Sequence, residues 1–245
     1  QAGFDARTPL SIDQDPTQFT RPLQRDFKGA RIGWLGDLNG YLPTEPGVMD
    51  LCGNALRNFA TIGCTVEEVQ PDFAPERLWR TWLTLRGFLL AGIAGPLYAN
   101  EKTRALLKPE AVWEIESGLK LTGADVWRAS ADRSAWYQAL NTLFQKFDFL
   151  VLPSAQVFPF DATQDWPKSI AGQTMDTYHR WMEVAIGGTL AGVPTIAVPA
   201  GFSPAGLPMG LQILGPTQQD LAVLQMACAW EQASGYTQRR SPLLG

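Results

Sequence analysis

The side chains that could carry nucleophilic chemistry are sparse in this sequence and form no familiar pattern. A serine hydrolase needs a hydroxyl, a base that takes its proton, and backbone donors for the developing oxyanion. The sequence has one histidine, His179, and it lacks both a GxSxG motif and a Gly/Ser-rich turn before a helix. A Ser–His–Asp arrangement would rest on His179 alone, and we interpret His179 as a polar structural residue early in a helix.

Metal, phosphate and thiol chemistry have no better support in the sequence. One histidine and scattered carboxylates give no facing set of metal ligands, and the phosphate loops GxxxxGK[ST] and GxGxxG are absent. Asp161 and Asp165 lie in a polar segment, where exposure to solvent explains them better than acid–base pairing does. Cys52, Cys64 and Cys228 match no zinc or CxxC spacing and are interpreted as reduced thiols. We therefore expect no catalytic residue, no metal site and no cofactor on this chain.

Composition indicates a folded globular protein. Of the 245 residues, 45% are hydrophobic and 18% are charged, a balance that argues against wholesale disorder. The formal net charge of −4 gives no basic surface for nucleic acid. Since no run of roughly 18 apolar residues is present, we expect no membrane-spanning segment. Free thiols and the lack of glycosylation sequons favour a cytoplasmic location.

The hydrophobic pattern predicts an α/β fold. Residues 1–30 are polar and broken by prolines, so we expect an arm there and a single domain over 31–245. A strand at 31–36, a helix from about residue 46 to Gly63 and a strand at 65–69 form a β–α–β unit. Further helices are predicted at 76–98, 109–121, 124–147, 178–190 and from Asp220 to Gly235. Segments 149–152 and 195–198 are apolar throughout, as in strands buried on both faces, and 210–214 is a third strand.

Several motifs follow one another along the chain in a recognisable series. Residues 189–202 read TLAGVPTIAVPAGF, residues 206–216 read GLPMGLQILGP, and a helix led by Asp220 follows. Upstream, the chain reads FDFLVLPS at 147–154, DFKGARIGW at 26–34 and GFDARTPLSI at 3–12. Thr8 stands at a position that is usually Asp in the family that this series resembles. This series resembles the C-terminal half of the amidase signature family of serine amide hydrolases. The resemblance implies a mixed β-sheet covered by helices on both faces.

The resemblance also implies where the reactive groups lie. The family's lysine, its bridging serine held by a cis peptide and its nucleophilic serine would all precede Gln1. The lysines present here have no Ser-rich partner: Lys28, Lys102, Lys108, Lys120, Lys146 and Lys168. The chain is then the C-terminal portion of an amidase that hydrolyses amide C–N bonds, inactive alone. Its expected partners are a small-molecule amide and the missing N-terminal half.

Four residues of this half are candidates for substrate binding. Ser154 and Gln156 directly follow the apolar strand at 149–152, in a long segment (153–175) without periodicity. Tyr178 and Trp181 come just after that segment and could form pocket walls, because α/β sheets bind ligands beyond the carboxyl ends of their strands. Gln212, within GLPMGLQ, is interpreted as a structural hydrogen-bonding residue.

A second hypothesis stays open: a non-catalytic α/β module, derived from the same fold, that binds a ligand or pairs with a partner. A start codon near Gln1 and a monodisperse, ligand-binding fragment would favour it. An upstream Gly/Ser-rich stretch would favour the enzyme. Under the enzyme hypothesis we expect an exposed apolar patch where the other half docks. The oligomeric state is open, with a homo-oligomer among the alternatives.

Overall fold

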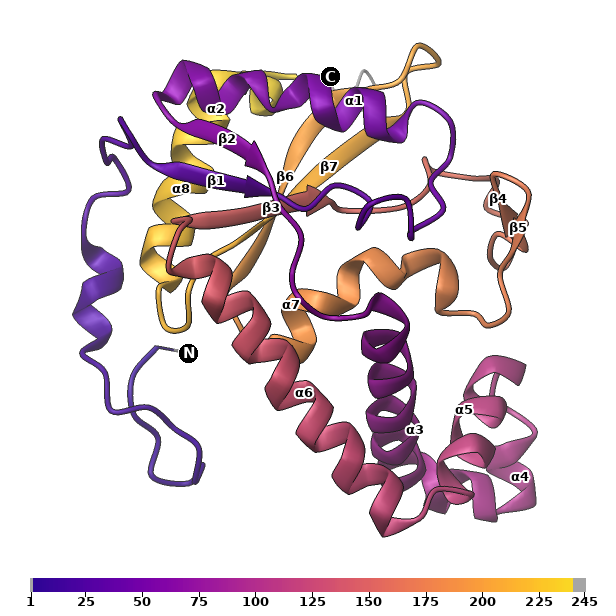
Figure 1. Ribbon diagram of the computed structural model, residues 1–245. Coiled ribbons are helices and arrows are strands. Elements are labelled where there is room, and N and C mark those ends of the chain that lie inside the picture. The colour runs from indigo at the N-terminus through magenta and orange to yellow at the C-terminus, as the bar shows by residue number, and fades with distance from the viewer. Residues whose placement is uncertain (1, 240–245) are drawn as a thin grey trace.

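A five-stranded sheet forms the centre of the computed structural model, which describes residues 2–239 (Figure 1). The strands lie in the order β2-β1-β3-β7-β6. β1 is parallel to β2 and to β3, whereas β7 is antiparallel to β3 and to β6, so the predicted α/β class with a mixed sheet is confirmed. The strands span Arg31–Trp34 (β1), Thr65–Glu68 (β2), Phe149–Pro153 (β3), Thr195–Phe202 (β6) and Pro208–Leu214 (β7).

Helices pack on both faces of the sheet and enclose two hydrophobic cores. Side chains alternate in direction along β3, so Phe149 and Val151 join one core while Leu150 and Leu152 join the other. Every residue of β3 is buried, as its uniformly apolar sequence predicts. The first core is closed by α1 (Val48–Ala55), α2 (Arg57–Ile62) and α8 (Asp220–Ser234), and the second by α3 (Pro75–Ala99), α6 (Gly123–Phe144) and α7 (Ile186–Ala191).

β6 departs from the expectation that both uniformly apolar strands are covered on both faces. It forms an edge of the sheet, with β7 as its only neighbour among the described strands. Val198 and Ala200 are buried in the first core, but Thr195, Ala197 and Pro199 are exposed. Coverage requires a neighbouring element as well as an apolar side chain, and Ala197 and Pro199 stay exposed on this edge strand.

A helical unit, residues 75–144, extends away from the sheet (Figure 1). It consists of α3, α4 (Glu101–Arg104), α5 (Pro109–Leu119) and α6, and the three longer helices agree with the predicted ranges to within a few residues. α6 begins with a capping box formed by Thr122 and Asp125. α3 and α5 cross where Gly87 faces Gly118, with no room for a side chain at Gly118. Among the described helices, none is long and apolar enough to cross a membrane.

The predicted helix over 178–190 is wrong in form. The segment is a 3-10 helix, η2 (Arg180–Ala185), kinked at Met182 and followed by α7. The backbone of Val184 is bound on both sides, donating to the Gln156 side chain and accepting from Gln212. These long-range hydrogen bonds fix the segment, and tertiary contacts therefore override its helical pattern.

Two other segments differ from the form that their sequence patterns predict. The helix expected from about residue 46 to Gly63 is divided into α1 and α2 at Leu56. The segment 153–175, without periodicity, contains a short hairpin of β4 (Ser169–Ile170) and β5 (Gln173–Thr174). Its turn places Ala171 and Gly172 at positive φ, the geometry that matches the twist of a two-residue hairpin.

The chain before β1 runs outside the sheet and is largely exposed (Figure 1). Its 3-10 helix, η1 (Pro16–Thr20), contains no buried residue. The segment before β1 contacts the rest of the fold at Phe27 and at Pro22. Phe27 packs edge-on against Phe149, and the carbonyl of Pro22 accepts a 3.0 Å hydrogen bond from the Gln225 side chain. A short 3-10 helix, η3 (Tyr236–Gln238), follows α8. The division into an arm over 1–30 and a domain over 31–245 stays a prediction.

Candidate functional site

The carboxyl ends of β1 and β3 meet at one edge of the sheet, because these two strands are parallel. The loops that follow them are joined through Glu45. Its backbone N–H donates to the carbonyl of Gln156 at 2.8 Å, and its carboxylate accepts from the backbone N–H of Phe158 at 2.8 Å. Ligands of α/β sheets bind at such an edge. We therefore place the candidate site here.

A pocket of about 420 Å³ opens directly after β3, and we call it the strand-end pocket. Ser154 and Trp181, two of the four predicted site residues, both line it. The Ser154 backbone donates to the carbonyl of Gly210 at 2.9 Å, and a Cβ at position 210 would lie 2.6 Å from Ser154 Oγ. Glycine at 210 therefore keeps room for the hydroxyl. The remaining lining is mostly apolar: Ala155, Val157, Phe158, Pro159, Phe160, Pro208, Met209 and Gly210.

Trp181 supplies both an apolar surface and a hydrogen-bond donor to this pocket. Its ring packs edge-on against Phe160, with 5.4 Å between ring centroids. In the part of the chain that the structure describes, its buried Nε1–H has no hydrogen-bond partner. Since a buried donor gains from finding an acceptor, a carbonyl oxygen of a bound molecule could take this N–H.

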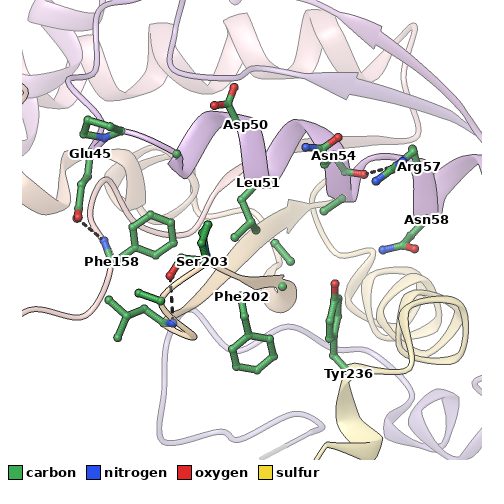
Figure 2. A pocket seen from close by; sticks show the side chains of 18 residues that line it. Glu45, Asp50, Leu51, Asn54, Arg57, Asn58, Phe158, Phe202, Ser203 and Tyr236 are labelled. Carbon is green, nitrogen blue, oxygen red and sulfur yellow. Dashed lines mark hydrogen bonds between the residues drawn. The ribbon is translucent and has the colours of Figure 1, made fainter.

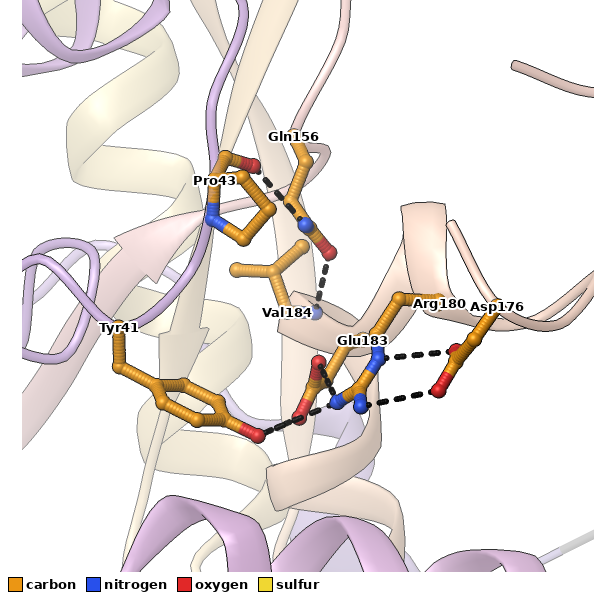
Figure 3. A network of polar contacts seen from close by, with 7 residues as sticks. All are labelled: Tyr41, Pro43, Gln156, Asp176, Arg180, Glu183 and Val184. Carbon is orange, nitrogen blue, oxygen red and sulfur yellow. Dashed lines mark hydrogen bonds and ion pairs between the residues drawn. The ribbon is translucent and has the colours of Figure 1, made fainter. Parts of the chain in front are cut away.

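Gln156 lies behind the pocket and is fully buried. Its side-chain Nε2 donates to the carbonyl of Pro43 at 3.0 Å, and its Oε1 accepts from the backbone N–H of Val184 at 3.1 Å (Figure 3). Gln212 acts in a similar way, donating to the carbonyls of Pro153 and Val184. Both amides connect backbone segments around the pocket, and a direct contact of Gln156 with substrate stays a prediction.

Tyr178, like Gln156, lies outside the lining of the strand-end pocket. Its ring packs edge-on against His179, at 5.0 Å between centroids, and against Trp166, at 6.3 Å. The structure thus brings Ser154 and Trp181 together, with Gln156 in support and Tyr178 on a neighbouring aromatic cluster. No signal in the local sequence distinguished the two pocket-lining residues from the other two.

A polar network connects the loop after β1 to the segment 176–184 (Figure 3). Arg180 pairs with Asp176 at 3.1 Å and with Glu183 at 3.0 Å, and Tyr41 donates its hydroxyl to Glu183 at 2.9 Å. Burial raises the pKa of Glu183 even though Arg180 and Tyr41 oppose that rise. Burial and the nearby Glu183 charge also raise the pKa of Tyr41. The network fixes the backbone on either side of Trp181.

A larger pocket, of about 840 Å³, adjoins the first and shares Phe158 with it. We call it the helix-side pocket, because α1 forms one wall and residues 200–207 form another (Figure 2). Leu51, Phe202 and Tyr236 line it together with the carboxylate-bearing Glu45. Sequence reasoning missed these residues, which come from segments far apart in the chain. The polar helix start at Thr44–Glu45 was the available signal for one of them.

The described residues offer no evident nucleophile with a base. His179 contacts Glu114 rather than a serine, with 3.0 Å between Nε2 and Oε1. Burial raises the pKa of Cys52 to about 12 and, with the Asp148 charge, that of Cys64 to about 11, so both thiols stay protonated and unreactive. No cluster of three or more potential metal ligands occurs within residues 2–239. The site as described can bind and orient a molecule.

Comparison with known proteins identifies relatives across most of the chain. A family model described as Amidase matches residues 4–224. An acylamidase of Rhodococcus erythropolis is 29% identical over 235 residues, covering 94% of this chain and 48% of the relative. One component of the glutamyl-tRNA(Gln) amidotransferase of Thermus thermophilus is 28% identical over 263 residues, covering 99% of this chain and 53% of the relative. The chain therefore spans about half the length of these relatives.

Solved structures also match most of this chain and about half of their own length. A bacterial aryl acylamidase of the amidase signature family superposes with a TM-score of 0.84 and 26% identity, covering 96% of this chain and 50% of that structure. A 6-aminohexanoate cyclic dimer hydrolase, at 16% identity, shares the fold with a TM-score of 0.80, covering 99% of this chain and 53% of that structure.

Proposed function

The chain belongs to the amidase family, and on that premise we propose that it is the C-terminal part of an enzyme that hydrolyses amide C–N bonds. Its own role is to supply one part of the sheet and one wall of the substrate pocket. The observation that carries this assignment is the strand-end pocket, where Ser154 and Trp181 converge beyond the carboxyl end of β3. The reaction is acyl transfer to water without a cofactor.

The reactive groups lie in the polypeptide that precedes Gln1. Resemblance to the family assigns it a nucleophilic serine, a bridging serine and a lysine, and two features of this chain support that division. Within residues 2–239, the single histidine contacts Glu114 and so is not paired with a serine. The exposed face of β6 also offers apolar surface, at Ala197 and Pro199, to a further element. The partner of this chain is accordingly the N-terminal half.

Within the assembled site, the chain binds the substrate amide through two kinds of contact. Phe158 and Phe160 offer apolar surface to the acyl or amine portion, since both line the strand-end pocket. The Trp181 Nε1–H and the Ser154 hydroxyl are hydrogen-bonding groups at its wall. Such a wall would orient a carbonyl oxygen while excluding water from its apolar flank. We also place the protein in the cytoplasm, where free thiols such as Cys52 and Cys64 stay reduced.

Activity measurements on the chain alone and on the joined halves test this assignment. Purified alone, the chain should not hydrolyse acetanilide or other aryl amides. Co-expressed with the polypeptide encoded upstream of Gln1, it should do so. Turnover by the isolated chain, surviving a second purification by a different chromatography, would contradict the division. A chain that stays inactive in the joined protein but binds ligands would favour the non-catalytic module instead.

A further inference from the structure

His179 is buried beside the pocket wall although no catalytic role uses it. The residue is 2% exposed and lies two positions before Trp181. Its Nε2 is 3.0 Å from Oε1 of Glu114, and the same Oε1 accepts a 2.6 Å hydrogen bond from Arg86 Nε. Glu114 lies on α5 and Arg86 on α3, both in the helical unit. One buried carboxylate thus connects the helical unit to the segment that carries Trp181.

Aromatic rings fix the orientation of the imidazole. Trp82 of α3 packs edge-on against it, with 4.8 Å between centroids, and Tyr178 packs edge-on at 5.0 Å. Trp113 of α5 lies at 6.5 Å. Within the described chain, neither ring nitrogen makes a hydrogen bond of good geometry, so the 3.0 Å approach of Nε2 to the Glu114 carboxylate is the polar interaction available to the ring. Loss of the Glu114 carboxylate or of the His179 imidazole would remove this polar contact between the segment and α5.

The next residue is held independently. Arg180 pairs with Asp176 and Glu183 (Figure 3), and its guanidinium lies 4.5 Å over the ring of Trp79 on α3. Two successive residues, His179 and Arg180, therefore each contact the helical unit. Trp181 follows them directly and lines the strand-end pocket.

We propose that His179 is a positioning residue. Through its contact with Glu114, the helical unit sets the position of Trp181 in the pocket wall. The helical unit thereby contributes to the choice of acyl or amine group. The pocket's substrate rests on the proposed function, but the coupling between Glu114 and Trp181 does not. Residues that never touch the substrate would in this way tune its fit, because they move the backbone that bears the indole.

Fluorine NMR of the chain labelled with 5-fluorotryptophan tests the coupling. The W181F variant identifies the Trp181 line among those of the nine tryptophans. E114Q and H179L should shift or broaden that line and leave the line of Trp230, in the opposite core, in place. H179Q retains a donor near Nε2 and should restore most of the wild-type position. E116Q, the same change on the exposed side of α5, is the matched control and should leave the Trp181 line unchanged.

Two outcomes would overturn the proposal. A Trp181 line that stays in place in folded E114Q and H179L would show that the contact does not position the indole. Equal shifts of all lines would mean that the pair serves only general stability. If H179L fails to fold, E114Q decides alone. In the joined enzyme, E114Q should raise KM for aryl amides several-fold with kcat unchanged; if the joined protein lacks amidase activity, the proposed function fails while the fluorine measurement still decides the coupling.

Discussion

The side-chain oxygen of Gln156 accepts a hydrogen bond from the backbone N–H of Val184 at 3.1 Å, across 28 residues of chain. The other end of the same amide donates to the carbonyl of Pro43. One buried side chain thus joins the loops after β1 and β3 to the segment beside Trp181, and the shape of the candidate site depends on it.

Replacing this amide should cost stability. Q156A leaves the N–H of Val184 and the carbonyl of Pro43 buried without their partner, and we expect a loss of about 1–3 kcal/mol in the free energy of unfolding. Urea denaturation measures it. Q173A, at an exposed position on β5, is the control and should stay within about 0.5 kcal/mol of wild type. Equal midpoints for both variants would mean that the buried amide contributes nothing.

The crossing of α3 and α5 should tolerate no side chain. A Cβ at Gly118 would collide with the carbonyl of Gly87, so G118A should destabilise the chain by about 1–3 kcal/mol or more as the helices separate. G92A on α3 meets open space and should stabilise by up to about 1 kcal/mol, because alanine favours a helix over glycine. Thermal unfolding followed by circular dichroism compares the two. A stable G118A would show that the two helices can move apart freely.

The carboxylate of Glu114 should make the stability of the fold depend on pH in the acid range. Its burial favours the neutral form, but the contacts with His179 and Arg86 outweigh burial and hold its pKa below the ordinary 4.5. A pKa lowered on folding gives stability that is present above pH 4.5 and is lost as pH falls further. The stability of E114Q should therefore fall less steeply than that of wild type between about pH 5 and pH 3.

Glu183 should change stability with pH in the opposite direction to Glu114. Its pKa is raised above 4.5 by burial, so the folded state holds its proton more tightly and stability decreases as pH rises through that raised value. E183Q should remove this decrease, and its stability relative to wild type should improve from about pH 4.5 upward. Urea midpoints across this range measure both variants. Parallel curves for E114Q, E183Q and wild type would contradict both assignments.

Trp181 should affect substrate binding in the joined enzyme. W181F keeps an aromatic surface but removes the Nε1–H, so KM for aryl amides should rise while the fold is retained. S154A should act in the same direction. W127F, at an exposed position on α6 outside both pockets, is the control. If replacing Ser154, Gln156, Tyr178 and Trp181 together by alanine left KM unchanged across several amides, the pocket assignment would be wrong.

The exposed face of β6 should be where the other half docks. The chain alone should bind hydrophobic dyes or self-associate, since Ala197 and Pro199 are uncovered. A197K places a charge on this face and should abolish association with the N-terminal half in pull-down assays. Q173K adds the same charge on β5 and is the control. A dye-free monomer of the wild-type chain, or full association of A197K, would contradict the docking assignment.

Much of the fold was determined by local sequence. The periodicity of α3, α5 and α6 and the uniformly apolar run of β3 predicted those elements, because side-chain spacing records which faces avoid water. The motif series also indicated the family. Ser154 and Gln156 were predicted from their place just after β3, and Tyr178 and Trp181 from their place just after the segment 153–175, since the carboxyl edge of an α/β sheet collects binding residues.

Tertiary structure decided the rest. The exposure of one face of β6 depends on which elements lie next to it, and a uniformly apolar sequence does not reveal its neighbours. The kinked helix at 180–185 exists because Gln156 and Gln212 bind Val184, and the position of His179 depends on Glu114 of α5. Each of these partners lies far away in the chain. Local periodicity describes the conformation of a segment, but only the folded chain brings distant charges and amides within hydrogen-bonding distance.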